Sequence, residues 1–125
     1  MSIRVDDALG VHTRAMDLRA MRSEILAANL ANEDTPGFQA RDIDFARELQ
    51  HADSAFDIGN ISAAPDQGPL PELQYRLPMQ PSLDGNTVDL STEQANFSKN
   101  AMDFQTGLTF LEMKLRGIKQ AIEGR

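Results

Sequence analysis

The sequence contains no cysteine and no tryptophan, and one tyrosine among its 125 residues. Disulfide bonds, thiolate zinc sites, iron–sulfur clusters and a cysteine nucleophile are therefore excluded. Basic residues are also scarce, because 12 Lys and Arg stand against 19 Asp and Glu, a net charge of −7. General nucleic-acid binding needs a basic surface that replaces phosphate counterions, so we expect no nucleic-acid partner.

Long apolar runs are missing as well. The sequence has no stretch of about 18 apolar residues, so no transmembrane helix is predicted. The first twenty residues mix charged and apolar side chains and lack the apolar core of a cleavable secretory signal, so we expect any export to use another route. The chain is nevertheless 41% apolar and 25% charged, which is typical of a folded protein of one small domain or a small domain with extended arms.

Residues 91–125 carry the most regular pattern. Apolar residues recur there at alternating spacings of four and three, the heptad repeat of a helix that packs on another helix. Ser91 and Gln94 fit a capping box at its start, and Gly124 fits its end. A lone helix cannot bury such a stripe, so it needs a partner along its length. We call the following residues the heptad stripe: Phe97, Ala101, Phe104, Leu108, Leu111, Leu115, Ile118 and Ile122.

Residues 1–34 supply the predicted partner. Apolar residues, among them Leu18 and Ile25, recur at helical spacing in this segment. Proline disfavours the α conformation of the residue before it, so Pro36 should end the helix near residues 32–34. We therefore predict a mainly α fold in which the N- and C-terminal helices pair as a coiled coil.

Two features mark the end of the first helix: a pair of asparagines with two possible roles, and a glycine in the turn that follows. Asn29 and Asn32 form either a C-terminal cap with asparagine in the left-handed conformation or a polar pair that sets register at a subunit contact. Gly37 stands where a type II turn requires a positive φ angle.

Residues 35–90 join the two helices, and the excess negative charge lies in residues 33–90, which hold eleven acidic residues and three arginines. Five of the six prolines lie between residues 65 and 81, so residues 50–83 are predicted to be a loop or arm that is mobile in the free subunit. Residues 41–49 are predicted to be a short helical or extended element. A minor β-hairpin is predicted between residues 74–77 and 87–90. The expected organisation is an N-terminal helix (1–34), a turn, short element and acidic arm (35–90), and a C-terminal helix (91–125).

The C-terminal helix has a second apolar face. It is covered either by neighbouring subunits or by residues 41–49 folding back on it. This face comprises Met102, Thr106, Thr109, Phe110, Met113 and Gly117.

Residues for catalysis or metal binding are sparse. His12 and His51 are the only histidines, and neither has a second ligand at metal spacing. Asp42 and Asp44 are two positions apart, which suits solvated carboxylates better than an acid–base pair. Residues 85–87 lack the glycines or lysine of a phosphate loop. We expect no enzyme activity, no cofactor, no metal and no small-molecule substrate.

Several short motifs carry a family resemblance. Residues 28–32 (ANLAN) followed by 34–38 (DTPGF) resemble the signature of bacterial flagellar rod and hook proteins. Residues 40–45 (ARDIDF), 84–90 (DGNTVDL) and 108–111 (LTFL) resemble more specifically the proximal-rod, or FlgB, family of the flagellar basal body. The resemblance implies a structural subunit that assembles through its terminal helices into a helical tube, which crosses the periplasm and transmits torque.

The resemblance also implies partners and site residues. The partners would be copies of the chain, other rod proteins, inner-membrane ring and export-gate components, the rod–ring adaptor protein and the flagellar type III export apparatus, which would export the chain without a cleavable signal. Val5 and Leu9 have the spacing of an export motif but lack its phenylalanine. The implied assembly interface comprises Leu18, Ile25, Asn29, Asn32, Thr35, Pro36, Gly37, Phe38, Arg41, Asp42, Phe45, Phe97, Phe104, Leu108, Leu111, Leu115 and Ile118.

Two other functions are compatible with the pattern. The chain could be another rod subunit of the same family. Alternatively, it could be a free-standing helical-hairpin chaperone or adaptor that grips a partner helix, which predicts a folded, cooperative monomer or dimer in dilute solution.

Overall fold

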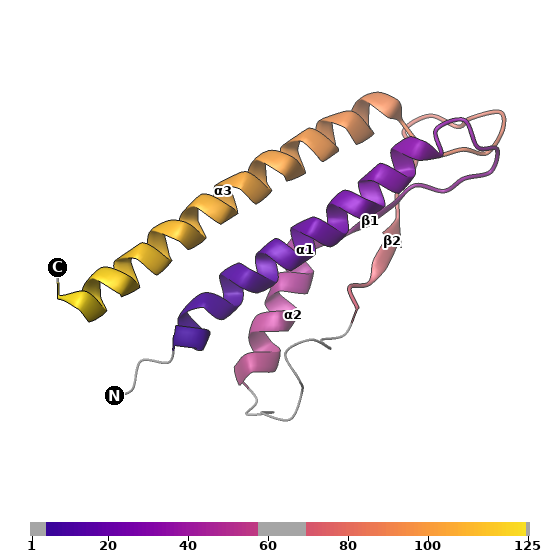
Figure 1. Cartoon of the computed structure of the whole chain (residues 1–125). Helices are drawn as coiled ribbons and strands as arrows, with labels where there is room; N and C mark the ends of the chain where they lie inside the picture. The colour runs from indigo at the N-terminus through magenta and orange to yellow at the C-terminus, as the bar shows by residue number, and fades with distance from the viewer. Residues whose placement is uncertain (1–4, 58–69, 125) are drawn as a thin grey trace.

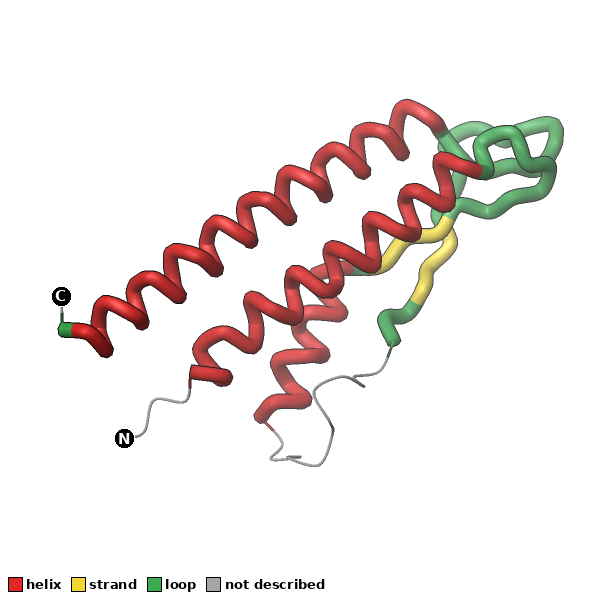
Figure 2. The backbone as a smooth tube through the Cα atoms, in the orientation of Figure 1, coloured by secondary structure: helices red, strands yellow, loops and turns green. Residues whose placement is uncertain are grey.

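The computed structural model describes residues 5–57 and 70–124, which form three helices and two short strands. In chain order these are α1 (Val5–Ala31), β1 (Arg41–Ile43), α2 (Phe45–Asp57), β2 (Leu73–Tyr75) and α3 (Leu90–Glu123). The two long helices, α1 and α3, run antiparallel side by side, so both termini lie at one end of an elongated molecule and the connecting loops at the other (Figure 1). The strand β1 and the helix α2 pack along α1 (Figure 2).

The prediction of a mainly α fold with the terminal helices side by side is therefore confirmed. Packing through the heptad stripe stays a prediction, because the residues that α3 buries completely are Glu93 and Asn100, which do not belong to it. None of the described helices is long and apolar enough to cross a bilayer.

The strand pairing differs from the prediction. β1 and β2 are antiparallel, with Arg41 opposite Tyr75 and Ile43 opposite Leu73. The predicted hairpin between residues 74–77 and 87–90 is wrong, because the Thr87 amide donates to the Phe38 carbonyl at 3.0 Å and α3 begins at Leu90, while β2 pairs with β1 and the Arg76 amide donates to the Ala40 carbonyl at 2.9 Å. Residues 87–89 instead lead into α3.

The predicted short element at residues 41–49 is both extended and helical, since β1 is followed directly by α2. Asp44 caps α2, because its carboxylate accepts from the Arg47 amide at 3.2 Å and its carbonyl accepts from the Glu48 amide at 3.0 Å. The loop predicted for residues 50–83 is wrong for 50–57, which continue α2, and for 73–75, which form β2. The rest of the predicted arm includes residues 58–69, which lie outside the described residues.

The C-terminal end of α1 is held by Asn86. Its side-chain amide donates to the carbonyls of Asn32, Glu33 and Thr35 at 2.9, 2.6 and 2.9 Å, which satisfies acceptors that the helix end leaves without partners. Gly37 has φ of +74°, as predicted for the turn after Pro36. The left-handed asparagine cap is wrong, because every described residue with positive φ is a glycine.

The apolar core is small. Among residues 9–51 and 70–124, four apolar side chains are buried, namely Leu18, Leu26, Ala40 and Ile43, where α1 meets β1 and its neighbours. An equal number of buried side chains is polar or charged: Asn29, Asn86, Glu93 and Asn100. Hydrogen bonds and ion pairs must therefore supply much of the specificity of this fold.

The second apolar face of α3 is open. Met102, Phe110 and Met113 are 70%, 58% and 61% exposed. Residues 41–49 do not cover them, because this segment packs against α1 instead. The back-folding alternative is therefore wrong.

The cap of α3 gives a direct test of where this helix begins. The Asp89 carboxylate accepts from the Thr92 amide at 3.3 Å, so Asp89 is the N-cap and the Ser91 capping box is wrong. We expect Asp89→Ala to lower the free energy of unfolding by about 1 kcal/mol, the usual contribution of an N-cap. Urea unfolding followed by circular dichroism measures the change. Ser91→Ala is the matched control and should stay within about 0.5 kcal/mol of the wild type; a larger loss at Ser91 than at Asp89 would place the cap at Ser91.

Candidate assembly surface

Four charged side chains form one connected network of ion pairs between both long helices and the strand pair. We call them the ion chain: Arg22 on α1, Asp42 on β1, Arg76 after β2 and Glu93 on α3. Arg22 binds Asp42 through two hydrogen bonds of 2.9 and 3.0 Å. Arg76 reaches the same carboxylate at 2.7 Å and pairs with Glu93 through its other nitrogen. Two positive and two negative charges alternate along this path, so the cluster as a whole is neutral.

Asn29 completes the ion chain from α1. Its side-chain amide donates to the Arg41 carbonyl at 2.7 Å and to Glu93 Oε2 at 3.1 Å, while its oxygen accepts from the Arg41 amide at 3.1 Å. The side chain thus occupies both backbone groups of a β1 residue, as a neighbouring strand would. Of the two interpretations of Asn29, the register-setting one fits these bonds, but the register is set between α1, β1 and α3 of one chain rather than at a subunit contact.

Glu93 is the most constrained of these groups. Its side chain has no exposed surface, and a buried carboxylate is costly unless ion pairs and hydrogen bonds satisfy it. Arg76 and Asn29 each bind one of its two oxygens. Moving α3 away from α1 and β2 would leave this charge without partners, so Glu93 fixes the position of the start of α3.

The ion chain also sets the ionisation of Asp42. Burial acts to raise the pKa of this carboxyl, but hydrogen bonds from Arg22, the Ile43 amide and Arg76, with the positive charge of Arg22, outweigh burial and hold the pKa below its ordinary value. The interpretation of Asp42 as a solvated carboxylate is therefore wrong.

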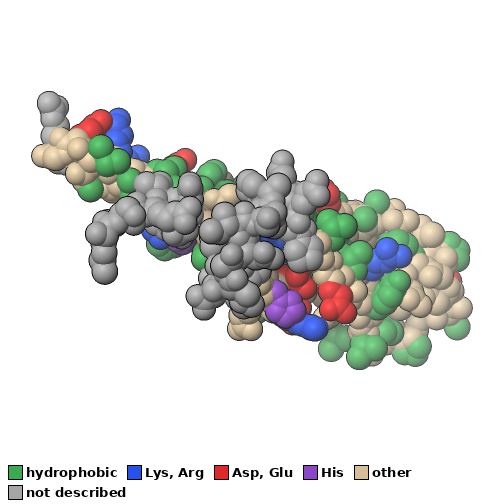
Figure 3. Space-filling model, turned by 90° about the horizontal axis from the view of Figure 1, so that it is seen from below, with side chains coloured by type: hydrophobic (Ala, Val, Ile, Leu, Met, Phe, Trp, Pro, Cys, Tyr) green, Lys and Arg blue, Asp and Glu red, His purple; other side chains and the backbone are tan. Residues whose placement is uncertain are grey.

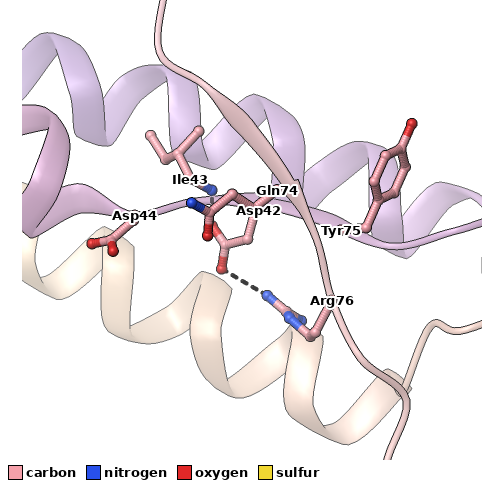
Figure 4. Close-up of a pocket in the computed structure, with 6 residues that line it drawn as sticks. All are labelled: Asp42, Ile43, Asp44, Gln74, Tyr75 and Arg76. Atoms are coloured by element: carbon pink, nitrogen blue, oxygen red, sulfur yellow. Dashed lines mark hydrogen bonds and ion pairs between the residues drawn. The ribbon is translucent and has the colours of Figure 1, made fainter.

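A hollow of about 280 Å³ lies beside the ion chain, lined by Asp42, Ile43, Asp44, Gln74, Tyr75 and Arg76. In Figure 4 the Asp42 side chain points toward Arg76, whereas Tyr75 and Asp44 point away from that pair. Asp42 is held in ion pairs and Asp44 caps α2, so neither carboxylate is positioned as a free acid or base. Within residues 5–57 and 70–124, no group of three or more His, Asp or Glu side chains is placed to hold a metal ion.

Several residues of the predicted interface are used inside the chain. Leu18 and Asn29 are 0% and 1% exposed. Asp42 belongs to the ion chain, and the Phe45 ring lies under the Arg19 guanidinium, 4.1 Å from its centre. Ile25 and Phe38 are partly buried, as is Asn32, whose amide donates to the Ala28 carbonyl at 2.7 Å. These residues make their contacts within the subunit, so they contribute to its fold rather than to an open contact surface.

Other predicted interface residues are open to solvent. Thr35, Pro36 and Gly37 form an exposed turn at the loop end, and Arg41 is exposed on β1 beside the Tyr75 ring. On α3 the heptad stripe divides: Phe97 and Leu115 are 38% and 45% exposed. The remaining stripe residues of the predicted interface are partly buried, namely Phe104, Leu108, Leu111 and Ile118. Of the weak export pair, Leu9 lies partly buried on α1, one helical turn after Val5.

The structure adds apolar surface that the sequence pattern missed. Leu77, Met79 and Leu83 are at least 90% exposed in the segment between β2 and α3. Hydrophobic side chains are also visible at this loop end in the space-filling view (Figure 3). These residues lie in the predicted proline-rich arm and follow no helical or strand period. Because they are exposed next to the Thr35–Gly37 turn, the loop end carries apolar surface in addition to that of α3.

The depressed pKa of Asp42 predicts a pH dependence of stability. A carboxyl with a lower pKa in the folded than in the unfolded state stabilises the fold above its ordinary pKa of about 3.9, and this contribution is lost as pH falls through the folded value. We expect Asp42→Asn to lower the free energy of unfolding by about 2 kcal/mol at pH 7. The difference between variant and wild type should shrink below about pH 4 in urea titrations. A difference that stayed constant from pH 7 to pH 3 would contradict this assignment.

The matched control for this titration is Asp44→Asn. Asp44 is exposed and contributes mainly through the cap of α2. We therefore expect a smaller loss at pH 7 than for Asp42→Asn.

Comparisons with known proteins agree with the resemblance seen in the sequence motifs. Residues 9–39, which include the end of α1 and the turn held by Asn86, match the family described as flagella basal body rod protein. The flagellar basal body rod protein FlgB of Salmonella typhimurium is 45% identical, over 97% of this chain and 96% of its own length. FlgB of Escherichia coli is 42% identical over 96% of both chains, and FlgB of Aeromonas hydrophila is 41% identical over 99% of this chain and 98% of its own. At this identity and coverage, the chain belongs to the FlgB family of flagellar basal body rod proteins.

Proposed function

We propose that this chain is a structural subunit of the proximal rod of the bacterial flagellar basal body, assembling through its terminal helices with copies of itself and other rod proteins. The observation that carries this function is the 41–45% identity to FlgB proteins over nearly their whole lengths. Those relatives are named as rod proteins, which supports a structural role in motility and gives no support for an enzyme.

The shape and surface of the subunit fit this role. A pair of antiparallel helices leaves apolar residues exposed along α3 and at the loop end. Surfaces at different places on one chain make heterologous contacts, which generate helical tubes when the operation does not close into a ring. In the assembled rod, helices of neighbouring subunits then pack on the heptad-stripe residues that α1 leaves exposed, which completes the coiled-coil packing.

The ion chain suits a subunit that transmits torque. It joins α1, β1, β2 and α3 through charge-assisted hydrogen bonds, which are directional and resist sliding of one element on another. The rod location further implies contacts with the inner-membrane ring, the export gate and the rod–ring adaptor. It also implies passage through the flagellar type III apparatus, for which Val5 and Leu9 remain weak candidates.

The alternative of a free-standing helical-hairpin chaperone loses support for two reasons. Relatives that match 96–97% of this chain are named as rod proteins. The small apolar core and the exposed stripe also suit a subunit that gains stability from its neighbours, whereas the chaperone requires a cooperative fold in dilute solution.

Leu115 gives the sharpest test of the assembly surface. Its side chain is 45% exposed on the heptad stripe, so Leu115→Asp should leave the subunit fold intact. At a subunit contact the new carboxylate would be buried without a partner, which weakens association by about 3 kcal/mol or more, roughly a hundredfold. We expect loss of swimming in soft agar and of assembled rods in purified basal bodies, with export of the subunit still detectable.

The control is Gln105→Asp, which places the same charge on an exposed position of α3 outside the stripe. We expect normal swimming from this variant. Normal swimming and normal rods with Leu115→Asp would show that the stripe makes no essential contact.

A further inference from the structure

The residues that α3 buries completely are polar. Glu93 and Asn100 have no exposed surface, and Asp103 binds Arg19 at 3.1 Å. These three residues, which we call the polar strip, are spaced by seven and three positions and so lie on one side of α3. Their partners on α1 are Asn29, the Arg19 carbonyl, the Ser23 hydroxyl and the Arg19 guanidinium.

The heptad stripe lies beside the polar strip and is turned partly away from α1. Each residue advances about 100° around a helix, so Phe97 and Leu115 lie about 60° and Ala101 about 100° from the direction of Asn100, whereas Leu111 and Ile118 lie within about 20° of it. Ala101 is exposed and Phe97 and Leu115 are 38% and 45% exposed, whereas Leu111 and Ile118 are partly buried. Hydrophobic burial alone would rotate α3 until this stripe faced α1.

Polar contacts oppose that rotation. Asn100 donates to the Arg19 carbonyl at 2.8 Å and to the Ser23 hydroxyl at 2.7 Å, while its own Oδ1 has no hydrogen-bond partner within the described residues. A buried amide with one unsatisfied oxygen adds little to the stability of the fold. It does, however, favour one orientation of α3, because rotation of the helix would break the two bonds of Asn100 together with those of Glu93 and Asp103.

We propose that the polar strip sets the rotation of α3 about its own axis and thereby keeps the outer side of the heptad stripe, Phe97, Ala101 and Leu115, turned outward for neighbouring subunits. Glu93, Asn100 and Asp103 are then positioning residues for assembly. This inference rests on the proposed function in one respect, the use of the stripe by neighbours; the rotation itself is a property of the isolated chain.

Engineered cysteine pairs can report the rotation, because the chain has no cysteine of its own. A Cβ atom at Gly107 would lie 3.8 Å from Met16 Cγ, so Met16→Cys with Gly107→Cys reports the observed rotation. Met16→Cys with Leu108→Cys reports a helix turned by about 100°. We expect disulfide formation in the purified full-length chain to be at least about tenfold faster for the first pair, by their Cβ separation.

The decisive change is Asn100→Ala with Asp103→Ala, which removes two members of the polar strip without placing a large apolar side chain toward α1. Because Glu93 still holds the start of α3, we expect the ratio of the two disulfide rates to fall by at least about threefold, with helical content retained, and swimming to be impaired because the outer side of the stripe turns toward α1. Gln94→Ala with Gln105→Ala makes the same kind of truncation at exposed positions and should change neither readout. Asn100→Ala alone serves if the double variant does not fold.

The outcomes separate the two proposals. An unchanged rate ratio in folded Asn100→Ala variants would overturn the role of the polar strip and leave the rod function untouched. A lowered ratio with normal swimming would overturn the claim that this rotation serves assembly. Failure of the unmodified chain to restore rods in a strain lacking its own FlgB would instead count against the proposed function, while the disulfide rates would still test the rotation.

Discussion

The buried carboxylate of Glu93 is the constraint on which the remaining structure depends. A charge with no exposed surface must keep its partners, and here the partners come from two other elements, Arg76 after β2 and Asn29 on α1. Arg76 in turn holds Asp42, and Asp42 holds Arg22, so the position of one side chain on α3 is coupled to the strands and to the middle of α1. The start of α3, the strand pair and α1 can therefore move only together.

This arrangement explains why the fold needs so little apolar core. Four apolar side chains are buried among residues 9–51 and 70–124, which is few for an elongated helix pair. Because polar contacts occupy part of the interface between α1 and α3, some apolar residues of the heptad stripe, such as Phe97 and Leu115, lie at the surface instead. The same residues are then available to neighbours, and the subunit becomes more stable when those neighbours are present.

The sequence predicted what depends on local chemistry. The end of α1 follows from the conformational effect of Pro36 on Thr35, and the positive φ of Gly37 follows from the turn that they require. α3 could be predicted because its period extends over many turns. The strand pair could not, since β1 and β2 have three residues each and about thirty residues between them, with no turn that links them. The ion chain was missed for the same reason: its members are separated by up to 71 positions in the sequence, and single charged residues carry no period.

The side of α3 that faces α1 shows the limit of periodicity most directly. A heptad stripe predicts that a helix covers it, but it does not identify which chain supplies that helix. Hydrophobic contact has no preferred direction, whereas a hydrogen bond to a fixed carbonyl does. This chain uses directional bonds at Asn29, Glu93 and Asn100 to define the shape of one subunit, and it leaves non-directional apolar contacts on the outside. A subunit divided in this way holds its own form before assembly and still presents a surface through which many copies can be joined.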